Sequence, residues 1–234
     1  MFAEINLTYL LTYLPPDNLE LFMDNEKLEK VQSTKFLGIH FDQHFTWDVH
    51  LDHLRKKMSR GAFAINMSKH ILSEKHLKMI YHTLVQSHLT YGILLWGNTY
   101  KKYLDRVAIT QKKSVRAVAG ARYNATSSPI FKRLGILKLT ELYKLYVGDF
   151  MYGFVNNQLP SQLQTLFHYH GQGHEHNTRQ STDPRTPNAT SELMRRSFLY
   201  AGPTQWLTLT DSLKSLRTKQ MFKSALKRSY IGEY

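Results

Sequence analysis

Two stretches of the sequence place lysine and arginine side chains at helical spacing, and such side chains bind phosphate groups. Residues 46–67 carry a basic cluster beside an apolar face, and residues 100–119 carry a separate basic stripe. The candidate residues are Lys56, Lys57, Arg60, Lys102, Arg106, Lys112, Lys113 and Arg116. Charges spaced along a rigid helix can follow a nucleic-acid backbone without reading its bases. The same pattern is also typical of a solvated helix face, so both interpretations stay open.

The basic residues are concentrated after residue 46. The formal net charge of the chain is +13. Residues 1–46 hold three basic and seven acidic residues, and the remaining 28 basic and 11 acidic residues give the rest of the chain a net charge of +17. A positive field of this size favours a polyanionic partner, and the expected partner is RNA, DNA or an RNA–DNA hybrid.

The composition argues against a membrane partner and against disulfides. The longest apolar run, Ile93–Trp96, is far too short to span a bilayer. Residues 1–14 contain no lysine or arginine, so they lack the basic start of a signal peptide. The chain has no cysteine, which excludes disulfides and cysteine-based zinc sites. We expect an intracellular protein, in the nucleus or the cytoplasm.

The carboxylates do not form a catalytic pattern. No two aspartates are adjacent anywhere in the chain. Asp42, Asp48 and Asp52 are close in sequence, but Asp42 ends a predicted strand whereas the other two lie on one helix face. We interpret them as a strand-terminus charge and helix-start charges rather than as ligands of two metal ions. No catalytic residue, metal ligand or cofactor is therefore predicted for this chain.

Residues 168–190 form a histidine-rich stretch. His168, His170, His174 and His176 fall within nine residues and are spaced by glycines, and threonine, proline and asparagine follow. A structural zinc site needs its ligands held in a rigid tetrahedron, which such a loop does not favour. The sequence predicts a linker here.

Hydrophobic periodicity predicts a mainly α (α+β) fold. Residues 19–23 and 35–42 read as strands of a small antiparallel hairpin, with Gly38 as an interior glycine at a bulge or a close approach. Helices are expected over 46–67, 73–95 and 100–119, with His88 on an apolar face as a core histidine. A helix is also expected from Glu192 to Tyr200, ended by Gly202-Pro203.

These elements predict four segments. Residues 1–45 hold the hairpin, and residues 46–167 form a helical bundle. Residues 168–190 are the histidine-rich linker, and residues 191–234 form a basic C-terminal helical module.

Short motifs distributed along the chain, taken in their order and spacing, carry a family resemblance. They are Lys35–Ile39 with Thr46-Trp47 and His50, Leu89–Gly92 with Trp96–Asn98, Leu104 with Gln111–Lys113 and Arg116, Leu134–Leu137, Met151-Tyr152, Leu159-Pro160, Thr178-Arg179, Gly202-Pro203 with Trp206, and Phe222-Lys223. Together they resemble the C-terminal part of reverse transcriptases from non-LTR (LINE-type, jockey-like) retrotransposons: the end of the palm, the thumb and a C-terminal module.

The resemblance implies roles for particular residues. Phe36, Leu37 and Gly38 match the primer-grip strand, which makes residues 1–45 a palm remnant. The helix at 46–67 would open the thumb and turn its basic cluster toward the template–primer duplex. The parent family holds Mg²⁺ on palm aspartates, in an Asp-Asp turn that is expected before the first matched residues. A palm-containing reverse transcriptase chain would then be a second partner.

The sequence thus leads to a principal hypothesis and two alternatives. The principal hypothesis is a fragment of an RNA-directed DNA polymerase that lacks the catalytic aspartates, is inactive alone, and holds template–primer nucleic acid on its basic helices. The alternatives are a non-functional relic of a decayed transposable element and a domesticated nucleic-acid-binding or structural protein.

Overall fold

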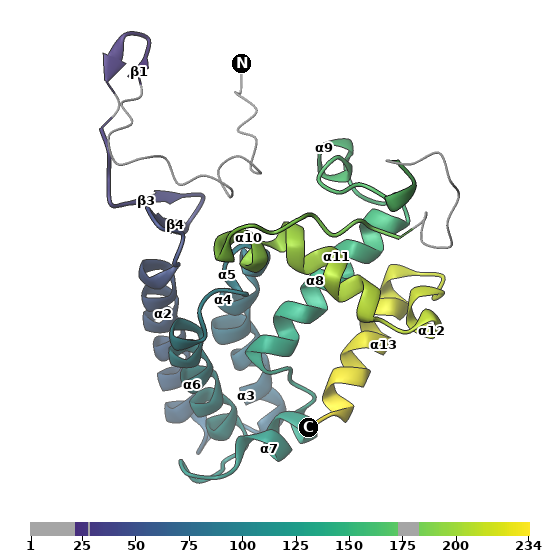
Figure 1. Cartoon of the computed structure of the whole chain (residues 1–234). Coiled ribbons are helices and arrows are strands. Elements are labelled where there is room, and N and C mark those ends of the chain that lie inside the picture. The colour runs from purple at the N-terminus through teal and green to yellow at the C-terminus, as the bar shows by residue number, and fades with distance from the viewer. Residues whose placement is uncertain (1–21, 28, 173–182) are drawn as a thin grey trace.

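The protein is mainly helical, with small β-hairpins before the first helix (Figure 1). The computed structural model describes residues 22–27, 29–172 and 183–234. Its helical elements are α2 (Asp48–Ser68), α3 (Glu74–Tyr81), the π-helical segment η1 (His82–Gln86), α4 (Ser87–Thr90), α5 (Ile93–Trp96), α6 (Lys101–Val118), α7 (Ser127–Leu134), α8 (Leu139–Val155), α9 (Ser161–Gln164), the 3-10 segment η2 (His170–Gln172), α10 (Glu192–Arg196), α11 (Phe198–Thr208), α12 (Asp211–Lys214) and α13 (Lys219–Gly232). The expected fold class is confirmed.

The N-terminal strands form two hairpins. The first pairs β1 (Phe22–Met23) with β2 (Glu26–Lys27), and the second pairs β3 (Ser33–Phe36) with β4 (Ile39–Asp42). The expected continuous strand at 35–42 is therefore wrong, because the chain reverses in its middle. Residues 19–21 of the other expected strand lie outside the described residues.

The reversal lies at Leu37 and Gly38. Both have positive φ angles, 46° and 81°, as the two central residues of a type I′ turn require. Gly38 thus supplies a turn conformation rather than an interior bulge. Phe36 and Leu37 are 64% and 73% exposed, so the expectation of a half-buried strand is also wrong for them. Ile39 is buried and anchors the hairpin on the helices.

The helix expected at 73–95 is broken into α3, η1, α4 and α5. The chain is extended at Tyr91 and left-handed at Gly92, where φ is 62°. A Cβ atom at Gly92 would lie 2.5 Å from Cδ1 of Ile39. The break therefore lets the hairpin pack tightly against the helices, a tertiary requirement that apolar periodicity does not reveal. The indole Nε1 of Trp96 donates to the Tyr91 carbonyl (3.0 Å), satisfying one carbonyl at the break.

Helices α2 and α6 lie side by side and form the first layer with α3 to α5 (Figure 1). Gly61 lets α2 approach η1 closely, since a Cβ there would be 2.7 Å from the Leu84 carbonyl oxygen. Gln111 is buried in α6, and its amide nitrogen donates to the Tyr81 hydroxyl (3.0 Å) and to the Leu137 carbonyl (2.9 Å). This amide joins three segments inside the core.

The C-terminal helices α11 and α13 pack on α8. The expected stop at Gly202-Pro203 is wrong, because both residues lie inside α11 and are buried. A Cβ atom at Gly202 would lie 2.9 Å from the sulfur of Met151, so the absence of a side chain allows this close packing. Packing against α8 thus maintains the helix through a proline that removes one of its hydrogen bonds. One hydrophobic cluster extends from α2 to α13, and the four-segment division stays a prediction.

The described ends of the histidine-rich stretch lie together. Tyr169 and Pro184 form an isolated antiparallel bridge, and the Arg185 amide donates to the His168 carbonyl (2.7 Å). His174 and His176 lie outside the described residues.

Candidate nucleic-acid interface

The starts of α2 and α6 are held together by polar contacts. The Thr99 hydroxyl, just before α6, donates to the Thr46 carbonyl just before α2 (2.8 Å). Further along the chain from this contact, the Arg106 guanidinium of α6 forms an ion pair with the Asp48 carboxylate of α2. The two helices that carry the predicted basic residues therefore lie next to each other at a fixed register.

Lys102, Arg106 and Lys113 form a line along α6. Their spacings of four and seven residues place them on one side of the helix. From Lys102 to Lys113 the helix rises about 16 Å, roughly five base steps of a duplex at 3.4 Å each. The Tyr103 ring lies near two of the cations, 4.6 Å from the Lys102 ammonium and 5.1 Å from the Arg106 guanidinium carbon. This ring restricts both side chains.

Arg116 and Lys112 differ from that line. Arg116 is half-buried, and its Nε donates to the Ala125 carbonyl (2.7 Å), so it fastens the loop after α6. Lys112 is also half-buried and lies a third of a turn away from Lys113. The structure thus assigns Arg116 a structural contact that its spacing did not indicate.

On α2, Lys56 is engaged by a carboxylate. Its ammonium lies 2.8 Å from Asp52, which also pairs with Arg55 at 2.9 Å. Hydrogen bonds from Lys56 and Arg55 hold the pKa of the Asp52 carboxyl well below its usual range. Arg60 is exposed and has no acidic partner among the residues that the structure describes.

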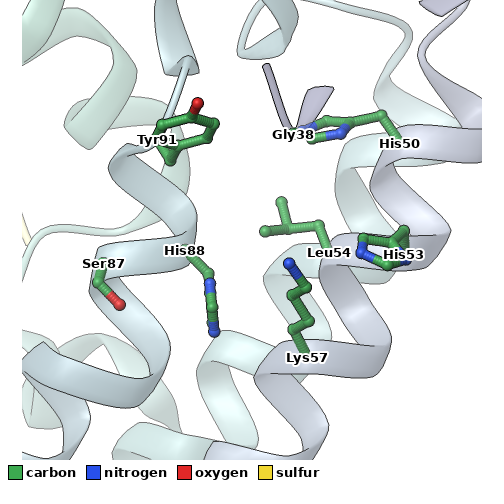
Figure 2. Close-up of a pocket in the computed structure, with 8 residues that line it drawn as sticks. All are labelled: Gly38, His50, His53, Leu54, Lys57, Ser87, His88 and Tyr91. Carbon is green, nitrogen blue, oxygen red and sulfur yellow. The ribbon is translucent and has the colours of Figure 1, made fainter. Parts of the chain in front are cut away.

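Lys57 lies on the opposite side of α2 from Asp48. The two residues are nine positions apart, which is half a turn after two full turns. Asp48 faces α6, whereas Lys57 faces α4 and lines a cavity there (Figure 2). Lys56 and Arg60 occupy the outward face between these two sides. The predicted residues of α2 and α6 therefore extend around α2 instead of forming one flat patch.

The cavity between α2, α4 and the β3–β4 turn has a volume of about 410 Å³. Its lining residues are Gly38, His50, His53, Leu54, Lys57, Ser87, His88 and Tyr91, and none of them is acidic. Sequence reasoning missed this site. His88, expected in the core, is half-buried and lines it, across from Lys57 (Figure 2). His50 and His53, His88 and Tyr91, and Ser87 and Tyr91 are pairs at i, i+3 or i, i+4 spacing, which was the available signal.

The cavity disfavours the protonated, cationic form of its three histidine rings. Burial, with His40, His53 and Lys57 nearby, lowers the pKa of His50 from 6.5 to about 4. Burial, and then the Lys57 ammonium, lowers the pKa of His53 and of His88. All three effects reflect the same fact, that this cavity is partly desolvated and positively charged.

The predicted primer-grip residues sit at the mouth of this cavity. Gly38 lines it, while the exposed side chains of Phe36 and Leu37 form the tip of the hairpin. The Tyr91 hydroxyl donates to the Leu37 carbonyl and so fixes the turn on the helical layer.

The three aspartates considered in sequence all have structural partners. Asp42 accepts from the backbone amides of Thr46 (2.9 Å) and Trp47 (2.6 Å), so it holds the loop before α2. Asp48 and Asp52 form the ion pairs described above. In the described part of the chain, no group of three or more histidine, aspartate or glutamate side chains is placed to hold a metal ion. None of the described helices is long and apolar enough to cross a membrane.

Two proteins of Drosophila melanogaster match part of the chain in sequence. The probable RNA-directed DNA polymerase from transposon BS is 23% identical over 141 residues, which cover 58% of this chain and 16% of that protein. The RNA-directed DNA polymerase from mobile element jockey is 29% identical over 112 residues, 46% of this chain and 12% of that protein. The chain thus contains a region related to retrotransposon RNA-directed DNA polymerases, and spans less than a fifth of either relative.

No protein-family profile matches the chain. No solved structure matches it. The expected relation to reverse transcriptases is confirmed at this level, whereas the jockey-like subtype and the C-terminal position within such an enzyme stay predictions.

Proposed function

We propose that this chain is the thumb-like, duplex-holding part of a LINE-type, jockey-like reverse transcriptase. The relation to the two Drosophila polymerases supports a template and primer as its ligands. The basic helices supply a surface of the right charge for them. RNA, DNA and an RNA–DNA hybrid share the phosphate backbone, so binding through this surface carries little sequence preference.

One observation supports this proposal most strongly. Lys57, Arg60, Lys102 and Lys113 are all exposed, and none of them pairs with a carboxylate within the described ranges. Side chains in the ion pairs of α2 are already neutralised, and a phosphate would have to displace their partners. The free cations on α6 and α2 can instead displace the counterions that are condensed on a phosphate backbone, which drives association.

The hairpin tip fits the predicted primer grip. A backbone turn with exposed Phe36 and Leu37 can contact the sugar-phosphate chain of a primer or the palm of a polymerase. Phe63, Met67 and Ile71, near the C-terminal end of α2, are 65%, 59% and 86% exposed. These apolar side chains favour a second candidate function, docking on a palm-containing reverse transcriptase chain.

The chain alone is proposed to have no polymerase activity. Two-metal nucleotidyl transfer needs carboxylates that share a pair of Mg²⁺ ions. Asp42, Asp48 and Asp52 are each committed to amides or cations. A primer-extension assay with Mg²⁺ tests this: we expect no nucleotide incorporation, and extension by the purified chain would refute it.

The binding proposal is tested by fluorescence anisotropy with a short RNA–DNA hybrid at low salt. We expect the double variant Lys102→Glu/Lys113→Glu to weaken binding on the order of tenfold or more, because two phosphate contacts become repulsive. The matched control is Lys75→Glu/Lys144→Glu, which makes the same charge change on exposed positions of α3 and α8. Equal losses in both variants would show that net charge, and not this surface, governs binding.

The alternatives give different outcomes in the same experiment. A relic without function is supported if the wild-type chain unfolds cooperatively but fails to bind any of the nucleic acids at low salt. A domesticated binding protein is supported if one nucleic acid is bound far more tightly than the hybrid.

A further inference from the structure

The cavity between α2 and α4 collects positive charge without any acid to balance it. Its charge comes from Lys57, and three histidines whose pKa is lowered line it together with Gly38, Leu54, Ser87 and Tyr91. An ammonium group in a partly desolvated site without a carboxylate is stabilised when an anion enters, and the N–H groups of neutral histidines can donate to that anion. We propose that this cavity binds a single phosphate group, held by Lys57, His50 and His88.

His50 supplies the first donor. The side chain is 4% exposed, and its Nδ1 accepts a hydrogen bond from the His40 amide (3.4 Å). A neutral imidazole whose Nδ1 accepts carries its proton on Nε2. That Nε2 is buried and has no partner among the described residues. A buried N–H without an acceptor is costly, and because His50 lines the cavity, a small movement of its ring would let an anionic oxygen there accept from it.

Lys57 supplies the charge. Lys57 lines the same cavity as His50, His53 and His88, and its charge contributes to the lowered pKa of each ring. Figure 2 shows Lys57 rising from α2 with His88 on the facing helix α4. A ligand between them would receive donors from two helices at once.

A phosphate fits this arrangement better than a carboxylate. Phosphate offers at least two, and usually three, charged or polar oxygens in a tetrahedral arrangement, whereas a carboxylate offers two in one plane. The donors of this cavity come from α2 and α4, in different directions. The Ser87 and Tyr91 hydroxyls already donate to the carbonyls of Thr83 and Leu37, so they leave the anion to the lysine and histidines.

Binding is expected to depend on pH. The titratable groups around the cavity are Lys35 and His40 from the hairpin, His50, His53, Lys56 and Lys57 from α2, and His88 and Tyr91 from the α4 side. Burial first, and then the Lys57 charge, disfavour the protonated rings of His53 and His88, and a bound phosphate counteracts both effects. Because binding then favours the protonated rings, affinity for a phosphodiester should rise as pH falls from 7.5 to 6.0.

The source of the phosphate is left to the experiment. It is either free phosphate or the backbone of a nucleic acid, and the second case rests on the proposed function. The cavity sits behind the hairpin tip, where a backbone held by Phe36 and Leu37 could present one phosphate.

The test is a titration of the histidine ring NMR signals with inorganic phosphate and with dimethyl phosphate, at constant ionic strength set by chloride. Dimethyl phosphate keeps one charge from pH 6.0 to 7.5, so its pH dependence reports on the protein. We expect the signals of His50, His53 and His88 to shift together, with about 3- to 10-fold tighter binding of dimethyl phosphate at pH 6.0. Lys57→Gln should weaken binding about tenfold, and the exposed Lys75→Gln should leave it unchanged.

Several outcomes would overturn the proposal. The first is that the histidine signals shift no more with phosphate than with chloride. The second is a shift confined to one histidine. The third is that Lys57→Gln binds phosphate with the same affinity as wild type. His88→Gln gives a second check at a half-buried position, with a weaker pH dependence expected. A short RNA–DNA hybrid that competes with phosphate at these rings identifies the backbone as the source. Phosphate binding without hybrid binding supports this cavity site and contradicts the proposed function instead.

Discussion

The hydroxyl of Tyr91 donates a hydrogen bond to the carbonyl of Leu37, 54 residues earlier in the chain. Tyr91 lies at the break between α4 and α5, and Leu37 lies at the tip of the β3–β4 hairpin. This contact connects the turn to the helical layer, together with the Ile39 side chain, which rests on Gly92, and the His40 amide, which donates to His50 of α2. A two-stranded hairpin is marginal in water on its own, so the position of the tip depends on them.

Removing this hydroxyl should loosen the hairpin without unfolding the protein. In Tyr91→Phe we expect faster amide hydrogen exchange in residues 33–42 and a loss of global stability below about 1.5 kcal/mol. Tyr123→Phe is the control, because that side chain is 90% exposed. Exchange rates in the hairpin that match wild type would show that the remaining contacts, from Ile39 and His40, hold the tip without this hydroxyl.

The break before α5 requires a glycine. Gly92→Ala combines a positive φ with a Cβ atom 2.5 Å from Ile39 Cδ1, and we expect a loss of about 2–4 kcal/mol in the free energy of unfolding. Gly135→Ala also has a positive φ, 64°, but nothing lies within 4 Å of its Cβ. The control should therefore lose about 1 kcal/mol. Urea denaturation measures the free energy of unfolding of both variants. Equal losses would mean that the Ile39 side chain moves away from the added Cβ atom at little cost.

Gln111 is a buried polar link whose removal should be costly. Gln111→Ala leaves the Tyr81 hydroxyl and the Leu137 carbonyl without this partner and opens a cavity in the core. We expect a loss of about 2–4 kcal/mol. The neighbouring Lys112→Ala should lose less than about 0.5 kcal/mol. A change at Gln111 as small as that at Lys112 would contradict the buried link.

His50 should make the protein less stable in acid. Its pKa is lowered from 6.5 to about 4 in the folded protein, so protons bind the unfolded chain more readily between those values. The stabilisation is complete above pH 6.5 and is lost as pH falls toward 4, by at most about 3 kcal/mol for this residue. His50→Gln should be less stable than wild type at pH 7 and lose less stability between pH 7 and 5. Parallel pH profiles for the two proteins would contradict this assignment.

The sequence predicted the helical architecture well where apolar periodicity was long. The helices at 48–68 and 101–118 lie within two residues of their predicted bounds, and Val107, Gln111, Val115 and Val118 are buried at helical spacing on one face of α6. Such faces follow from local spacing alone. The core position of Gln111 could be predicted, whereas its partners could not, because Tyr81 and Leu137 are brought to it by tertiary packing.

The errors came from positions where packing overrides local signals. Gly38 was predicted to be an interior strand glycine. The turn was missed because it requires a positive φ at Leu37, which is uncommon for a leucine and cannot be predicted from its side chain. Gly202-Pro203 was read as a helix stop, although contact with α8 continues the helix through it.

The candidate site was predicted in part. Lys102, Arg106 and Lys113 share a side of α6, as their spacing requires. Which cations are free could not be predicted, because the pairing of Arg106 with Asp48 depends on how α2 meets α6. The cavity was missed for the same reason, since His50 and His88 come from helices that are apart in sequence.

The salt dependence of hybrid binding tests the central claim most directly. A protein that neutralises phosphates shows a linear fall of the logarithm of the association constant with the logarithm of salt concentration. We predict such a fall for the wild-type chain, and a slope reduced in magnitude by about 2 in Lys102→Gln/Lys113→Gln, one for each lost contact. Lys75→Gln/Lys144→Gln should keep the wild-type slope. A folded wild-type chain that does not bind, or a slope that the α6 variant leaves unchanged, would contradict the account.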